Sequence, residues 1–166
     1  MTLLMARIDD RLVHGQVIVG CCEPLGGRRI LVCDDVVSRD SVRQSLFAAA
    51  VPPDIEVEFL EPARCPARLQ ALSDVGENAV TILLTRDCAT MRTLVESGSG
   101  IDRVVVGGLH RRPGAVEVVE GFHLTEADRN DLVALIRAGC RVAFQSVPGA
   151  AEVGAETVLG DTGTSP

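Results

Sequence analysis

The chain has 166 residues, and 46% of them are hydrophobic, which is enough to build the core of one domain. Its net charge is −7, all 16 cationic residues are Arg, and four Phe are the only aromatic residues. This composition argues against nucleic acid as a partner, because such a surface needs clustered cations and aromatic stacking platforms. The absence of Lys also excludes Schiff-base chemistry and the Lys of a P-loop.

Apolar runs alternate with amphipathic stretches along the chain. The runs predict strands at Leu3–Ile8, Arg29–Cys33, Ile55–Leu60, Ala79–Leu84, Arg103–Val106 and Arg141–Val147. The stretches between them predict helices at Gly15–Glu23, Arg39–Ala50, Ala63–Leu72, Ala89–Ser97 and Glu126–Ala138. Because the apolar runs are continuous, both faces of the sheet are expected to be covered. The order predicts an α/β fold with a doubly wound, mainly parallel open sheet and helices on both faces.

Two segments depart from this alternation. Arg112-Pro113-Gly114 is a turn signal, and it predicts a hairpin that attaches one antiparallel strand at Ala115–Val119. Residues 149–166 are rich in Gly, Ala and Thr and contain no Arg, which predicts a weakly ordered tail. The expected organisation is therefore one domain, residues 1–148, followed by that tail.

The six cysteines, at positions 21, 22, 33, 65, 88 and 140, have no C-x-x-C spacing and are predicted to be core thiols. The three histidines lack the short spacing of metal ligands, so no metal site is predicted. The first residues do not resemble a signal peptide, and no apolar run approaches the roughly 20 residues of a membrane span. A reduced, cytoplasmic location is therefore expected.

The segment Arg7–Gln16 concentrates ionisable groups at the end of the first predicted strand. Its guanidiniums suit phosphate oxygens, His14 can act as a nucleophile near neutral pH, and Gly15 permits close backbone approach. The helix expected from Gly15 onward would direct backbone N–H groups at an anion. The alternative is a solvated turn whose Asp residues cap the helix and pair with Arg.

Other predicted site residues follow neighbouring strands, since ligands bind at the carboxyl ends of strands in open α/β sheets. This rule gathers five residues as lining of the site: Asp34, Thr85, Gly107, Gly108 and His110. The first turn lacks G-x-G-x-x-G, which argues against a dinucleotide site.

The string RIDDRLVHGQV resembles the phosphorylation-site segment of IIB components in the mannose/fructose/sorbose family of the sugar phosphotransferase system. Five further segments are similar to the family's pattern: Cys33–Val37, Ser41–Arg43, Val51–Pro53, Ile82–Thr85 and Val104–Leu109. The resemblance covers residues 3 to 148 and implies a protein-N(pi)-phosphohistidine–sugar phosphotransferase. A IIA phosphohistidine donor would phosphorylate His14 at Nδ1, and the group would pass to a sugar taken up through the membrane subunits IIC and IID.

Within that mechanism the expected roles divide among four neighbours of His14. Arg11 is predicted to clamp the phosphate, and Asp10 to orient either His14 or the Arg11 fork. The N–H groups around Gly15 and Gln16 are predicted to cradle the phosphate oxygens. No cofactor is expected, membrane association would come through the partner subunits, and formation of a homo-oligomer is left open.

One departure from the family's pattern supports a second hypothesis. After H-G-Q-V the family usually continues with an aromatic and basic helix segment, whereas Ile18–Pro24 contains neither kind of residue. The surface for partners is therefore expected to differ. The alternative function is a phosphorylatable regulatory or signalling module of an incomplete phosphotransferase system, without sugar transport.

Overall fold

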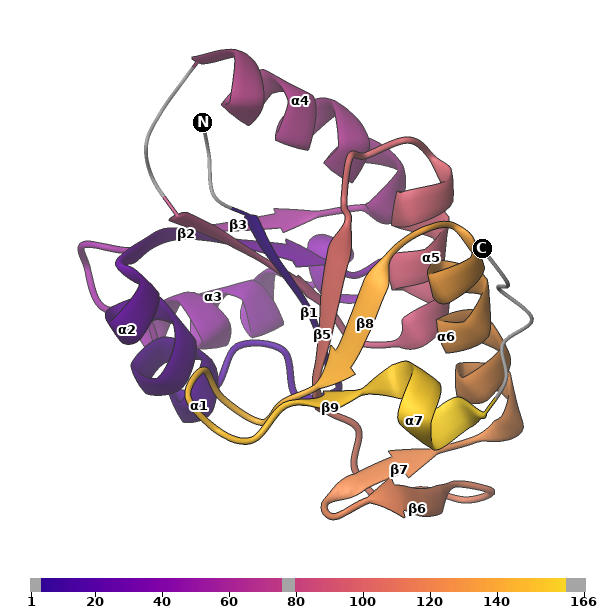
Figure 1. Cartoon of the computed structure of the whole chain (residues 1–166). Coiled ribbons are helices and arrows are strands. Elements are labelled where there is room, and N and C mark those ends of the chain that lie inside the picture. The colour runs from indigo at the N-terminus through magenta and orange to yellow at the C-terminus, as the bar shows by residue number, and fades with distance from the viewer. Residues whose placement is uncertain (1–3, 76–79, 161–166) are drawn as a thin grey trace.

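A central sheet of seven strands organises the computed structural model, which describes residues 4–75 and 80–160 (Figure 1). The strand order is β3-β2-β4-β1-β5-β8-β9. The bounds are β1 (Leu4–Asp9), β2 (Gly27–Cys33), β3 (Glu56–Leu60), β4 (Val80–Thr85), β5 (Arg103–Gly108), β8 (Arg141–Phe144) and β9 (Val153–Gly154). All neighbouring pairs are parallel except β8 with β9. The predicted mainly parallel open sheet is confirmed.

Helices cover both faces of this sheet, as the doubly wound prediction requires (Figure 1). One face carries α3 (Ser41–Ala49) and a continuous helical segment made of α1 (Gly15–Val17), the π-helical η1 (Ile18–Cys22) and α2 (Glu23–Leu25). The other face carries α4 (Cys65–Val75), α5 (Cys88–Glu96), α6 (Glu126–Arg137) and α7 (Ala155–Leu159). Two 3₁₀ turns, η2 (Val37–Arg39) and η3 (Pro62–Arg64), precede α3 and α4.

Local sequence explains where these helices begin. Asp40 and Asp87 cap α3 and α5 by accepting the N–H groups of the third residue that follows. Thr125 and Asp128 form a capping box at the start of α6. The strands between the helices bury continuous apolar runs, such as Ile30–Cys33, on both sides at once. The six cysteines are free and buried, as predicted.

The antiparallel strand expected at Ala115–Val119 is not part of the central sheet. Instead β6 (Val116–Val119) pairs with β7 (Phe122–Leu124) in a separate two-stranded sheet (Figure 1). The physical reason is that β1 and β8 already occupy both edges of β5, so a hairpin strand has no edge to join. Among the strands that the structure describes, β9 is the single antiparallel strand of the central sheet.

The prediction of a weakly ordered tail is wrong for residues 149–160. The strand β9 pairs with β8, and α7 follows it with Ala155 fully buried. Val153, Val158 and Leu159 pack against the core. A few apolar residues suffice here because they meet a free sheet edge and the neighbouring α6. The domain therefore extends beyond residue 148, and residues 161–166 lie outside the described part of the chain.

Candidate active site

His14 lies directly before α1 and is held through both ring nitrogens. Its backbone is extended, as at a helix N-cap, and its carbonyl accepts the N–H groups of Val17 and Ile18. The Nδ1 atom accepts the Gln16 N–H at 3.3 Å, and Nε2 lies 3.0 Å from Oδ2 of Asp9. The side chain is 17% exposed. The ring is thus fixed by neighbours yet accessible from the surface.

Asp9 determines the tautomer of His14. Burial of this fully enclosed carboxylate would raise its pKa, but the His14 hydrogen bond and the Arg7 charge together lower the pKa below its ordinary value. Asp9 is therefore ionised near neutral pH and can only accept hydrogen bonds. From this partner we assign the ring proton to Nε2, which leaves the lone pair on Nδ1. The Gln16 N–H, a donor that points at Nδ1, agrees with that assignment.

The buried guanidinium of Arg7 forms an ion pair with Asp9. The Arg7 side chain is fully buried; its Nη2 donates to Oδ2 of Asp9 at 2.8 Å and to the Ser146 carbonyl at 2.9 Å. Its Nη1 donates to the Gln145 carbonyl at 3.4 Å. Arg7 and Asp9 share a face of β1 because side chains two apart in a strand point the same way. The Arg7–Asp9 ion pair therefore sets the charge next to His14.

Gly107 and Gly108 make room for this ion pair. A Cβ atom on Gly107 would lie 1.8 Å from Cζ of Arg7, and one on Gly108 would lie 2.9 Å from Oδ1 of Asp9. Both glycines belong to β5, the parallel neighbour of β1. The two glycines thus lie directly against the side chains of Arg7 and Asp9, and any side chain at either position would displace one of them.

Arg11 lies at the mouth of the site. Its side chain is 44% exposed, its Nη2 donates to Oε1 of Gln16 at 2.7 Å, and its Nε lies 3.7 Å from Oδ1 of Asp9. Leu12 turns the chain between Arg11 and His14 with a φ of 56°, an uncommon value for a residue with a side chain. Such backbone is retained where the surroundings enforce it, and the Leu12 side chain is fully buried.

Asp10 does not orient His14 or Arg11 as expected. Its Oδ1 lies 2.6 Å from Nδ1 of His110, and its Oδ2 accepts the His110 N–H at 2.7 Å. The Asp10 N–H donates to the Gly108 carbonyl. Because consecutive side chains at the end of a strand point to opposite faces, only one of the two adjacent carboxylates can reach His14. That one is Asp9, and Asp10 instead ties the loop after β1 to the loop after β5.

The remaining predicted residues have structural bonds of their own. Oδ1 of Asp34 accepts the N–H groups of Val36 and Val37, and Oδ2 accepts Nε of Arg86 at 2.6 Å. Burial alone would raise the pKa of Asp34, but Arg86 and these N–H groups lower it. Thr85 is fully buried and its hydroxyl donates to the Asp87 carbonyl. These bonds shape the turns after β2 and β4, and none of them involves His14.

Sequence reasoning did not choose Asp9 as the partner of His14. It expected the segment that contains Arg86 near the site but gave Arg86 no role; this residue follows β4, the strand next to β1, and its side chain is 37% exposed. The alternation of side chains along Arg7-Ile8-Asp9 was the available signal for Asp9. In the described residues no group of three or more potential metal ligands occurs. Over the same residues no helix is long and apolar enough to cross a membrane.

Comparison with known proteins identifies the family. Residues 3–165 match the family described as "PTS system sorbose subfamily IIB component". The chain belongs to this family. As a IIB component it is a phosphotransferase of the sugar phosphotransferase system, which confirms the resemblance noted in its first loop.

Named relatives of this IIB component act on several sugars. It is 30% identical to the N-acetylgalactosamine-specific phosphotransferase enzyme IIB component 1 of Escherichia coli (strain K12), over 89% of the chain and 92% of that protein. It is 33% identical to the mannose-specific EIIAB component of the same strain, over 77% of the chain but 39% of that longer protein. The crystal structure of the IIBSor domain of the sorbose permease from Klebsiella pneumoniae superposes with a TM-score of 0.86 and 27% identity, covering 96% of both chains.

Proposed function

We propose that this IIB component accepts a phosphoryl group from a IIA partner on Nδ1 of His14 and passes it to a sugar during uptake through IIC and IID membrane subunits. The observation that carries the proposal is the Asp9–His14 contact, which leaves Nδ1 as the unprotonated nitrogen. The mannose-specific EIIAB relative, whose name combines IIA and IIB, supports a IIA donor.

The transfer needs no proton movement at His14. The Nδ1 lone pair attacks phosphorus as the bond between phosphorus and the donor nitrogen breaks. The phosphorylated ring then carries positive charge with its proton still on Nε2, and the Asp9 carboxylate stabilises that charge at 3.0 Å. When the sugar hydroxyl attacks, it releases its proton to water, the electron pair of the P–N bond returns to Nδ1, and the ring recovers its starting tautomer.

Donors for the phosphate oxygens surround Nδ1. In the unphosphorylated protein the Gln16 N–H donates a long hydrogen bond of 3.3 Å to Nδ1 of His14. After phosphorylation the Nδ1 lone pair forms the bond to phosphorus, and the Gln16 N–H donates to a phosphate oxygen instead. A Cβ atom built on Gly15 would meet no atom within 4 Å, so the space beside its Cα is open to a phosphate oxygen. Arg11 adds an exposed guanidinium that Gln16 holds near the ring. Arg11, Gly15 and Gln16 thus form the phosphate-binding group.

His14 labelling tests this assignment. Incubation of the protein with phosphorylated IIA is expected to add one acid-labile, base-stable phosphoryl group, and His14→Ala should take up none. His110→Ala is the matched control and should be labelled normally. Phosphorus–nitrogen NMR correlation should locate the group on Nδ1. Label on His110, or a bond to Nε2, would contradict the proposal.

The second candidate is a regulatory module without transport. It is favoured by the helical segment after His14, which exposes Val19 where the family usually has aromatic and basic residues. Reconstitution with the IIC and IID subunits of a relative separates the candidates. Phosphorylation of sugar by the complex supports transport, whereas labelling of His14 without any sugar phosphate supports regulation. In either role we place the protein in the cytoplasm, at the inner face of the membrane when bound to such subunits.

A further inference from the structure

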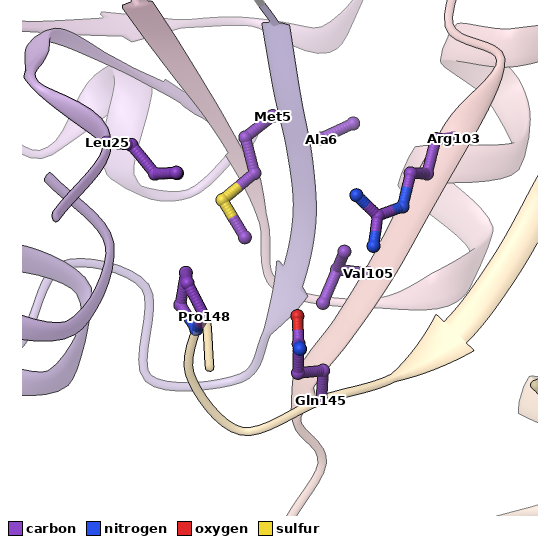
Figure 2. A pocket seen from close by; sticks show the side chains of 7 residues that line it. All are labelled: Met5, Ala6, Leu25, Arg103, Val105, Gln145 and Pro148. Carbon is purple, nitrogen blue, oxygen red and sulfur yellow. The ribbon is translucent and has the colours of Figure 1, made fainter. Parts of the chain in front are cut away.

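A cavity of about 150 Å³ lies beside the central sheet, away from every side chain used above (Figure 2). It opens on the face that carries α1 and α2, between β1, β5 and the loop after β8. The lining consists of Met5, Ala6, Leu25, Arg103, Val105, Gln145 and Pro148. Figure 2 shows the polar ends of Arg103 and Gln145 directed toward the space that Met5, Leu25 and Pro148 surround.

The volume and the walls restrict the occupant. A cavity of about 150 Å³ in a protein interior is large enough to hold benzene, so a molecule with a small branched hydrocarbon body fits here. Most of the lining is aliphatic, which favours an apolar body over a sugar or a nucleotide. The opening at Arg103, whose side chain is 43% exposed, admits a polar end that stays in contact with water.

The two polar side chains specify complementary groups. Nη2 of Arg103 donates to Glu152, and no other hydrogen bond of its guanidinium occurs among the described residues, so its remaining N–H groups can bind a carboxylate. The side-chain nitrogen of Gln145 donates to the Ala150 carbonyl at 3.0 Å. Its Oε1 is therefore held in place, and no residue in the described part of the chain donates to it, which leaves an acceptor that suits a hydroxyl group.

We propose that this cavity binds a short aliphatic 2-hydroxycarboxylate. The carboxylate pairs with Arg103, the hydroxyl donates to Oε1 of Gln145, and the hydrocarbon body fills the space beside Met5. The cavity shares a loop with the phosphorylation site, because the carbonyls of Gln145 and Ser146 also accept hydrogen bonds from Arg7. The binding itself does not depend on the function proposed for His14.

Methyl NMR titration of the full chain with 2-hydroxyisovalerate tests the proposal. We expect saturable shifts confined to the methyl groups that line the cavity, those of Met5, Ala6, Leu25 and Val105, with a dissociation constant on the order of 1 mM for a ligand of this size. The neutral amide of the same acid should bind about tenfold more weakly, because it lacks the charge that Arg103 recognises. Isovalerate, which lacks the hydroxyl, should bind severalfold more weakly.

Two variants and a matched control make the outcome decisive. Arg103→Gln should weaken binding about tenfold, whereas Arg141→Gln should not change it. Arg141 is the matched control because it lies opposite Arg103 in the register of β5 and β8 but does not line the cavity. Leu25→Phe should fill the space and abolish binding. The proposal is overturned if those methyl groups show no saturable shift up to about 20 mM ligand, or if the two Arg variants behave alike.

Discussion

Gly107 is expected to be indispensable because it accommodates a buried charge. In Gly107→Ala the new Cβ would lie 1.8 Å from Cζ and 2.2 Å from both terminal nitrogens of Arg7, so the guanidinium must leave its place. Its bonds to Asp9 and to two loop carbonyls would then be lost. Breaking a buried ion pair costs about 3–5 kcal/mol. For a chain of this length that corresponds to a fall in melting temperature of roughly 6–20 °C.

Thermal unfolding followed by circular dichroism measures this effect. Gly15→Ala is the matched control, because a Cβ at Gly15 meets no atom within 4 Å; its melting temperature should stay within about 2 °C of wild type. A double-mutant cycle adds a second check. In an Arg7→Met background, Gly107→Ala should cost markedly less, since the guanidinium is already absent. If Gly107→Ala melts within about 2 °C of wild type, or costs the same in both backgrounds, Arg7 does not depend on this glycine.

Three further predictions concern Arg11, the buried carboxylate of Asp9 and the C-terminal elements. Arg11→Ala should leave the melting temperature unchanged but slow phosphoryl uptake on the order of 100-fold. The control is Arg28→Ala, at an exposed Arg. An Arg11→Ala rate within about twofold of wild type, or an equal loss of rate in Arg28→Ala, would remove Arg11 from the mechanism. The pKa of Asp9 is lowered in the folded state, so its stabilisation is present above the unfolded value of about 3.8 and is lost as the pH falls through the folded value. The Asp9→Asn variant should therefore have a lower free energy of unfolding than wild type at neutral pH, and it should lose less of that free energy on acidification. Urea unfolding at neutral and acid pH measures both values, and equal losses in variant and wild type would show that Asp9 is not responsible. Truncation after Pro148 should lower the melting temperature by several degrees because it removes β9 and the buried Ala155, and an unchanged value would show that these elements add nothing to the core.

Local sequence determined most of the fold and the place of His14. The continuous apolar runs predicted the parallel strands, because a strand whose two faces are both covered carries apolar side chains on each face. Thr125 and Asp128 marked the start of α6 because a capping box acts over one helical turn. His14 was predicted at a helix start, and the structure places it there as the N-cap. These features depend on neighbours within a few residues along the chain.

Tertiary structure decided which groups surround that histidine. Sequence reasoning gave the orienting role to Asp10, but the structure directs Asp9, the last residue of β1, to His14 and directs Asp10 to His110. The role of Gly107 became visible only when β5 lay beside β1 with Arg7 between them. The guanidinium of Arg7 donates its other hydrogen bonds to the carbonyls of residues 145 and 146, about 140 residues away along the chain. Burial of the Arg7 charge needs partners from β1 and from the loop after β8, and only the assembled sheet brings that loop within hydrogen-bonding distance.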